Sequence, residues 1–260
     1  MGAVGSVAEG YLPALSRRTF SYACVAAAAV AIFYLTKEKW YPRSLNLIRE
    51  TSDSNLLTGD REAASNASET KTLPPGQHEI RSILRWNIDH PGITPQNPKL
   101  DQESWKLTVE GEIRGPQIFT WRDFLSLESL ESVSDFHCVE GWSVRNCRWY
   151  GVPFRVLVDQ VKPTGDCRYV YFTCADGYST SLELTNLLKE NVLLAYRLND
   201  QPLEESLGGP MRLVVPDKYA YKSAMWIQKI VFTKNRRQGF WESQGYSETA
   251  DVWRGDRFAK

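Results

Sequence analysis

One cysteine, Cys138, stands in a sequence context that suits a metal ligand. The stretch from residue 135 to residue 154 reads DFHCVEGWSVRNCRWYGVPF. The aromatic residues around Cys138 predict a strand that ends at the thiol, and Glu140-Gly141 predicts a turn directly after it. Thiolate sulfur is a ligand that soft, redox-active metals prefer. The sequence therefore predicts that Cys138 binds such a metal.

The remaining cysteines and the histidines form none of the common metal-site patterns. The chain has five cysteines and three histidines, and no two cysteines are spaced as Cys-x-x-Cys. This excludes the usual spacing of zinc ribbons, thioredoxin-like motifs and haem-attachment sites. So few histidines also disfavour a histidine-rich metal site. We interpret Cys147, Cys167 and Cys174 as small buried hydrophobic residues.

Two blocks of the sequence resemble the sulfite oxidase family of molybdopterin oxidoreductases. The block around Cys138 is similar to the family's molybdenum-cysteine segment. Residues 191–232 are similar to its second signature, which has a small-residue turn, an arginine two positions after a proline, Leu-Val-Val-Pro and a basic loop. The resemblance covers roughly residues 80–258 and is nearest to short bacterial and archaeal members that consist of the molybdenum domain alone. It implies a mixed-sheet α+β domain in which Cys138 is the molybdenum ligand.

The second signature implies how the cofactor is held. Molybdopterin carries a phosphate, which needs fixed positive charge and backbone N–H groups around it. An arginine can bind a phosphate through two N–H groups, lysines add point charges, and glycines let the backbone approach the pterin. Each basic residue taken alone is equally a solvated surface charge. At the matching positions, the predicted cofactor-binding residues are Gly208, Gly209, Arg212, Lys218, Lys222 and Ser223.

Three further residues are placed near the cofactor by the resemblance. Tyr246 follows Trp241 by five positions, where a family tyrosine lies on the substrate side of the metal, so Tyr246 joins Cys138 as a predicted catalytic residue. Aromatic packing is the alternative for Tyr246. Asn87 corresponds loosely to a cofactor-contacting segment at the start of the domain. Asp176 stands where the family often has an acidic residue near the pterin, although Asp176-Gly177 is equally a turn signal.

At three positions the sequence departs from the family pattern. Leu207 stands where a histidine or asparagine is frequent, and Met225 stands where a lysine is common. Animal and plant sulfite oxidases bind the sulfite anion with an arginine at the position of Ser143. The sequence therefore leaves sulfite, a sulfoxide and other small oxyanions or oxides open as substrates.

Three segments precede the expected catalytic domain of residues 80–260. Residues 1–18 end in Ser16-Arg17-Arg18, which with Phe20 resembles a twin-arginine export signal. Residues 19–36 are apolar and predict a membrane anchor or signal, and residues 37–79 have the composition of a flexible tether. We expect the catalytic domain on the extracytoplasmic side of the cell membrane. An ordinary positive-inside anchor and a mitochondrial presequence are the alternatives.

The folded part is expected to be an α+β domain of short strands with interspersed helices. Thr120 and Asp123 have the spacing of a helix N-cap, and Pro153 suits the first turn of a second helix. Asn199-Asp200 predicts a hairpin turn. The predicted strands are 105–111, 131–138, 169–174, 211–215 and 226–233, with the hairpin in 192–203, and the predicted helices are 120–127, 153–161 and 185–190.

The resemblance implies an enzyme with molybdenum and molybdopterin as cofactors. It would transfer an oxygen atom on a small sulfur-containing or oxyanion substrate and act as a monomeric domain. The chain carries no haem or iron–sulfur motif, so we expect a separate electron carrier such as a membrane haem protein or a cytochrome. A formal net charge of zero and the lack of a basic stripe argue against nucleic-acid binding.

Two other functions are open to this sequence. Leu207 and Met225 motivate a catalytically silent, membrane-tethered binding domain that retains the fold. The other is a thiol enzyme in which Cys138 is the nucleophile and His137 the base. Neighbouring side chains on a strand point to opposite faces, which argues against a shared geometry of these two residues.

Overall fold

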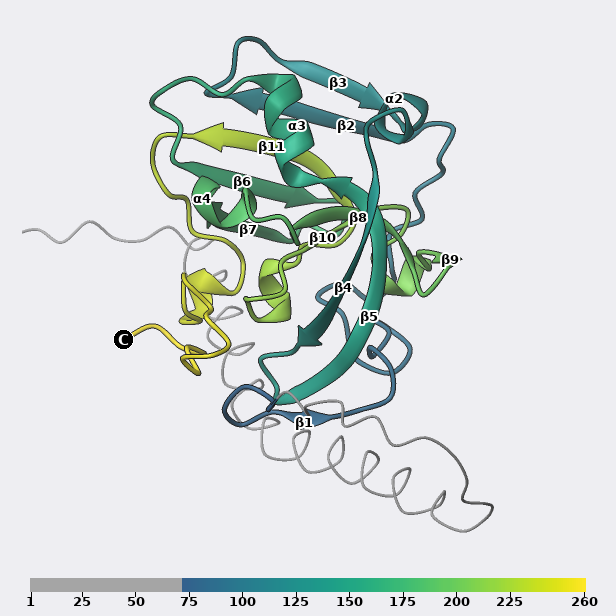
Figure 1. The fold of residues 1–260 in the computed structure, drawn as a ribbon, viewed down its shortest axis with the longest axis vertical. Coiled ribbons are helices and arrows are strands. Elements are labelled where there is room, and N and C mark those ends of the chain that lie inside the picture. Colours follow the sequence, from purple (N-terminus) through teal and green to yellow (C-terminus); the bar gives the residue numbers. More distant parts are fainter. Residues whose placement is uncertain (1–71) are drawn as a thin grey trace, which may run out of the picture. The chain divides into compact units, whose positions relative to one another are not determined.

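The computed structural model describes residues 72–260, which form two mixed β-sheets with short helices (Figure 1). The first sheet has the strand order β1-β5-β8-β10, with β4 paired to β5 and β9 paired to β8. The second has the order β3-β2-β11-β6-β7. In each sheet one strand pair is parallel, β1 with β5 and β2 with β11, and the other pairs are antiparallel. The predicted mixed-sheet α+β class is confirmed.

The strands and helices have the following bounds. In the first sheet, β1 is His78–Glu79, β4 Leu130–His137, β5 Trp142–Pro153, β8 Leu193–Leu198, β9 Gln201–Pro202 and β10 Arg212–Val214. In the second sheet, β2 is Lys106–Gly111, β3 Gln117–Thr120, β6 Tyr169–Cys174, β7 Ser179–Glu183 and β11 Ile227–Thr233. The helices are α2 Trp121–Leu125, α3 Phe154–Val161 and α4 Leu184–Leu187, with 3-10 turns η1 Glu205–Leu207, η2 Ala220–Lys222 and η3 Glu242–Gln244.

The predictions for the N-terminal segments lie outside the described residues. These are the twin-arginine-like motif, the anchor of residues 19–36 and the tether up to residue 71. Within residues 72–260, no helix is long and apolar enough to cross a bilayer. The end of the predicted tether is part of the folded domain, because β1 pairs with the start of β5 and Gln77 Nε2 donates to Cys138 O at 3.0 Å.

The apolar spacing of the sequence explains the second sheet. In β2, Leu107 and Val109 alternate with polar residues and are fully buried. In β6, Val170 and Phe172 do the same. One buried row on each strand turns the same face of the sheet toward the main hydrophobic core.

The two longest helices begin where the sequence predicts. The Thr120 side chain accepts from Asp123 N and the Asp123 carboxylate accepts from Thr120 N, which forms the capping box of α2. Pro153 is the residue before the first turn of α3. The helix α3 lies against the second sheet (Figure 1), where the Phe154 ring is 5.8 Å from that of Phe172 on β6.

Strand β5 is the longest strand of the described chain and connects most of the first sheet. Its first residues pair with β1, most of its length pairs with β4, and its last residues pair with β8. At Gly151 the β8 backbone comes so close that an added Cβ would lie 2.3 Å from Leu194 O. Residues 142–153 were not among the strands predicted from the sequence, and only the change to a helix at Pro153 was predicted.

Candidate functional site

One cavity gathers most of the predicted site residues. Its walls come from residues 83–94, the turn between β4 and β5, the turn after β6, and the segments 220–226 and 241–246. It encloses about 1080 Å³, including the open space at its mouth. The predicted site residues on its lining are Asn87, Cys138, Asp176, Arg212, Ser223 and Tyr246.

The end of β4 and a tight turn place Cys138 on the cavity wall. β4 ends at His137, Cys138 N donates to Trp142 O at 2.9 Å, and Gly141 N donates to Cys138 O at 3.1 Å. Gly141 has a φ of 106°, a conformation that favours glycine. His137 is buried away from this lining, with Nδ1 2.8 Å from Ser143 Oγ. The side chains of Cys138 and His137 therefore lie in different surroundings. This argues against a thiol enzyme, in which His137 would have to contact the Cys138 sulfur as its base.

Glu140 forms the polar surroundings of the Cys138 thiol. Its Oε2 lies 3.8 Å from Cys138 Sγ and accepts from Trp142 Nε1 at 3.1 Å, while its Oε1 lies 2.6 Å from His90 Nε2. Burial, together with the nearby Glu140 carboxylate, raises the pKa of the Cys138 thiol. A thiol of raised pKa is a poor free nucleophile, whereas a bound metal cation favours the thiolate. The surroundings thus suit a ligand better than a nucleophile.

Arg212 is a buried cation that also lines the cavity. It is 2% exposed, and its two terminal nitrogens donate to Leu207 O and Ser223 O at 3.0 Å each. Its guanidinium carbon lies 5.0 Å from the centre of the Phe136 ring and 5.7 Å from that of Trp149. Burial lowers the pKa of Arg212 to about 10, so the group stays protonated at neutral pH. Each terminal nitrogen keeps a second N–H for an anion.

Asn87 and Asp176 both line the cavity and both hold turns. Asn87 has a φ of 58°, its Oδ1 accepts from Gly92 N at 2.9 Å, and its Nδ2 donates to Asn97 Oδ1 at 2.9 Å. Asp176 Oδ1 accepts from Tyr178 N at 3.0 Å, in the turn between β6 and β7. The predicted turn at Asp176 is confirmed, and burial raises the pKa of this carboxyl group.

The structure does not bring four of the predicted residues to the cavity lining. Gly208 and Gly209 are needed for packing, since an added Cβ would lie 2.7 Å from Met225 Cγ at the first and 2.2 Å from Leu203 O at the second. The backbone of Lys218 pairs with that of Asp251 in an isolated antiparallel β-bridge. The fourth residue, Lys222, is paired with a buried carboxylate. Cofactor contacts of these four residues stay predictions.

Several aromatic residues of the cavity wall were not predicted as site residues. The Trp86 ring lies 4.5 Å from the His90 ring, and both residues line the cavity. The Trp241 ring lies 5.2 Å from that of Tyr246, and the Tyr178 hydroxyl donates to a backbone carbonyl of η2. The signal available in the sequence was its high content of tryptophan and tyrosine, which often line cofactor pockets.

The fold and this site define a class of protein. Residues 94–241 match the family model of the oxidoreductase molybdopterin binding domain, and the chain belongs to this family. It is an oxidoreductase, and the cofactor is molybdopterin with molybdenum.

Individual relatives extend the likeness over most of the described chain. The chain is 35% identical over 186 residues to the oxidoreductase YuiH of Bacillus subtilis, which covers 72% of this chain and 91% of that protein. It is 28% identical over 222 residues to the protein-methionine-sulfoxide reductase catalytic subunit MsrP of Campylobacter jejuni, covering 79% of this chain and 70% of the relative. The sulfane dehydrogenase SoxCD of Paracoccus pantotrophus shares the fold, with a TM-score of 0.51 and 19% identity over 54% of this chain and 41% of that one.

The described residues fit the cofactor of the family. The cavity is lined mainly by apolar and aromatic side chains with a few polar groups, as ligand pockets commonly are. A thiol stands on its wall for the metal, and the buried Arg212 has no carboxylate partner within residues 72–260. A buried cation without a partner calls for an anion. The phosphate of the cofactor would supply such an anion.

Proposed function

We propose that this protein reduces a small, uncharged sulfoxide by oxygen-atom transfer at a molybdenum centre bound to Cys138. The supporting observation is that Cys138, Arg212 and Tyr246 line one cavity, although they come from three distant parts of the sequence. The overall reaction takes up two electrons and two protons, and yields a thioether and water.

Each of these residues has a separate task. The bound cofactor supplies the two-electron chemistry. Cys138 would hold the metal through its sulfur. Arg212 would hold the phosphate of the pterin through those N–H groups that do not donate to Leu207 O and Ser223 O. The Tyr246 phenol would hydrogen-bond the substrate oxygen. The aromatic side chains of Trp86 and Trp241 would help to exclude water from the bound substrate.

The charges on the cavity lining favour an uncharged substrate over sulfite. Within the described lining, Arg212 and His90 are the basic side chains, and Glu140 and Asp176 are the acidic ones. Once Arg212 holds a phosphate and His90 is paired with Glu140, the lining offers no further cation for a dianion. Ser143, at the position of the sulfite-binding arginine of other family members, is buried and donates to Gln77 Oε1 at 2.8 Å.

The electrons would come from a separate carrier. The MsrP relative is named a catalytic subunit, and the reaction proposed here needs two electrons for each turnover. We propose a membrane haem protein or a cytochrome as this carrier. A membrane anchor in residues 19–36, with the catalytic domain outside the cytoplasm, would hold the enzyme close to it. We also propose that the substrate is a small molecule and that the catalytic domain is monomeric.

Metal analysis of Cys138→Ser beside wild type tests the proposal directly. We expect wild type to contain molybdenum and pterin and to turn over methionine sulfoxide with a chemical reductant. Cys138→Ser should lose the metal–sulfur signal in X-ray absorption and nearly all turnover. The control is Cys167→Ser, a half-buried thiol outside the cavity, which should behave as wild type. Wild type without molybdenum would refute the proposal, and faster turnover of sulfite than of sulfoxide would refute the substrate class.

The catalytically silent alternative is motivated by Leu207 and Met225, and Met225 lines the cavity where a lysine is common in the family. The same measurement separates the two functions. A protein that retains pterin and molybdenum after purification excludes the silent domain, whereas an empty cavity in wild type supports it.

A further inference from the structure

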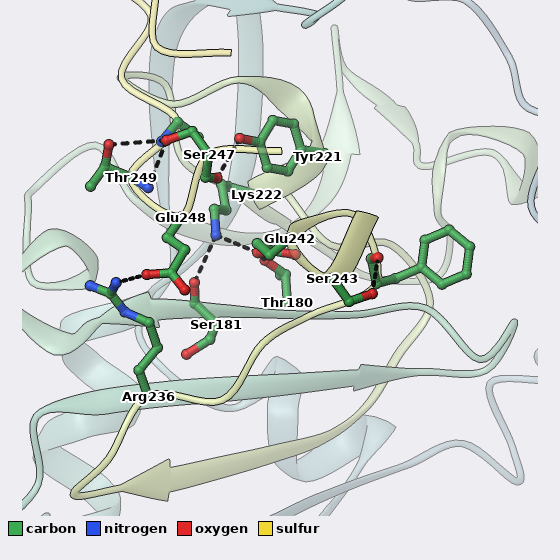
Figure 2. A network of polar contacts seen from close by, with 12 residues as sticks. Thr180, Ser181, Tyr221, Lys222, Arg236, Glu242, Ser243, Ser247, Glu248 and Thr249 are labelled. Carbon is green, nitrogen blue, oxygen red and sulfur yellow. Dashed lines mark hydrogen bonds and ion pairs between the residues drawn. The ribbon is translucent and has the colours of Figure 1, made fainter. Parts of the chain in front are cut away.

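A buried ion pair lies behind the wall of the cavity. Lys222 of η2 and Glu242 of η3 form this pair, and their side chains are 1% and 2% exposed. The Lys222 ammonium also donates to Ser181 O at 3.0 Å, and Thr180 Oγ1 donates to the same Glu242 oxygen at 2.5 Å. Figure 2 shows Lys222 between Glu242 and the backbone of β7. Three segments that are far apart in the sequence therefore meet at this pair.

Each partner of the pair is adjacent to residues that line the cavity. Lys222 follows Tyr221, and Glu242 follows Trp241 and precedes Tyr246 by four positions. The Tyr246 ring lies 5.6 Å from the Tyr221 ring and 5.2 Å from the Trp241 ring. The pair thus joins the two backbone segments that build the aromatic part of the wall.

The C-terminal segment is packed closely on β7, beside the Glu242 carboxylate. Phe240 N donates to Ser179 O at 2.8 Å. An added Cβ at Gly239 would lie 2.5 Å from Ser179 O and 2.5 Å from Glu242 Oε2. Only glycine allows the chain to pass at this point.

Stability alone does not account for a charged pair in this place. Apolar residues of similar volume stabilise a buried position as well as an ion pair or better, because two buried charges lose their hydration. An ion pair with hydrogen bonds does fix one relative arrangement of the segments that carry it. Lys222 has lost its hydration and makes two directional contacts in return.

We propose that the Lys222–Glu242 pair positions Tyr221, Trp241 and Tyr246 at the substrate side of the cavity. This role rests on the proposed function for its kinetic consequence. Lys222 and Glu242 are positioning residues, since neither lines the cavity. Without the pair, η3 can shift on β7, and the Tyr246 hydroxyl no longer has one position relative to the substrate.

The test uses the double variant Lys222→Met/Glu242→Leu in the full chain with its cofactor. It removes both charges and keeps side chains of similar size, so the fold is retained. If the pair acts by positioning alone, the molybdenum and pterin content stays as in wild type, whereas loss of pterin in the double variant alone would assign Lys222 to the cofactor and overturn the positioning role. Amide hydrogen exchange in residues 239–248 should accelerate by about tenfold, and KM for methionine sulfoxide should rise by about tenfold with a smaller change in kcat.

The control is an ion pair at the edge of the same segment. The Glu248 side chain is 37% exposed and pairs with Arg236 (Figure 2), and Glu248→Gln should leave exchange at η3 and KM unchanged, because Arg236 keeps its pair with Glu183 of β7. A single variant of Lys222 or Glu242 would leave one buried charge unpaired and could unfold the protein. The test therefore depends on the double variant alone. Wild-type exchange and wild-type KM in the double variant would overturn the positioning role. Wild type without pterin refutes the proposed function instead, and the exchange comparison still decides the role of the pair.

Discussion

Replacing Arg212 with methionine separates two proposed roles of this buried cation, which are its contribution to the stability of the fold and its binding of the cofactor phosphate. Its guanidinium donates to two backbone carbonyls at 3.0 Å, and charge-assisted hydrogen bonds of this kind contribute about 1.5–3 kcal/mol each. Burial of an unpaired cation costs several kcal/mol in the other direction. The two effects roughly offset each other, so Arg212→Met should change the stability of the cofactor-free protein by only about 1–2 kcal/mol.

The effect on cofactor binding should be much larger. Arg212 has no carboxylate partner within residues 72–260, and we propose that the phosphate of the cofactor is its counter-ion. Truncating one partner of a buried, hydrogen-bonded charge pair costs about 2–5 kcal/mol. This corresponds to an affinity that is lower by about 30-fold to several thousand-fold.

Thermal unfolding with and without cofactor measures both effects. The full chain is purified from a host that makes molybdopterin and from one that does not. The increase in Tm on cofactor binding should be large in wild type and smaller by about 5–15 °C in Arg212→Met. Arg197→Met is the control, because Arg197 is exposed and lies 5.8 Å from the Tyr150 ring, away from the cavity. An equal increase in Tm for wild type and Arg212→Met would refute the assignment of Arg212 to the phosphate.

Three further predictions concern the site, the sheet and the C-terminal segment. Tyr246→Phe should lower kcat/KM for a sulfoxide by about tenfold through one lost hydrogen bond, with unchanged molybdenum content, as steady-state kinetics would show. Gly151→Ala should lower the free energy of unfolding by about 1–3 kcal/mol in denaturant titration, because its Cβ would lie 2.3 Å from Leu194 O. Although desolvation opposes the shift, hydrogen bonds from Ser247 and Thr249 hold the pKa of Asp256 below its usual value. This stabilisation is complete above the unfolded pKa of about 3.9 and is lost as pH falls through the folded pKa, so Asp256→Asn should flatten the dependence of Tm on acid pH.

The sequence predicts those elements whose signals are local. The capping residues Thr120 and Asp123 and the hairpin turn of Asn199 and Asp200, with φ angles of 48° and 66°, depend on near neighbours only. Strand β5 was missed for a physical reason. Buried residues at both of its ends interrupt the alternation, and Asn146 has a φ of 52° in the middle of the strand.

The candidate site divides in the same way. Cys138 and Arg212 stand in motifs that resemble those of the family, and both line the cavity. Lys222 stands in an equally suitable motif, but its ammonium is taken by Glu242, which is 20 residues away in the sequence. No local pattern reveals that pairing, because it depends on how η3 packs on β7.

The departures from the family pattern are compatible with a bound cofactor. Arg212 donates to the backbone carbonyl of Leu207, a group that every residue type at this position provides. The Leu207 side chain packs against the hydrophobic cluster around Trp149 instead of the cavity. Met225 reaches the cavity because Gly208 has no side chain, since an added Cβ there would lie 2.7 Å from Met225 Cγ. A thioether in that position keeps the lining free of a second fixed cation, so under the proposed function it would weaken the binding of an oxyanion relative to an uncharged sulfur compound.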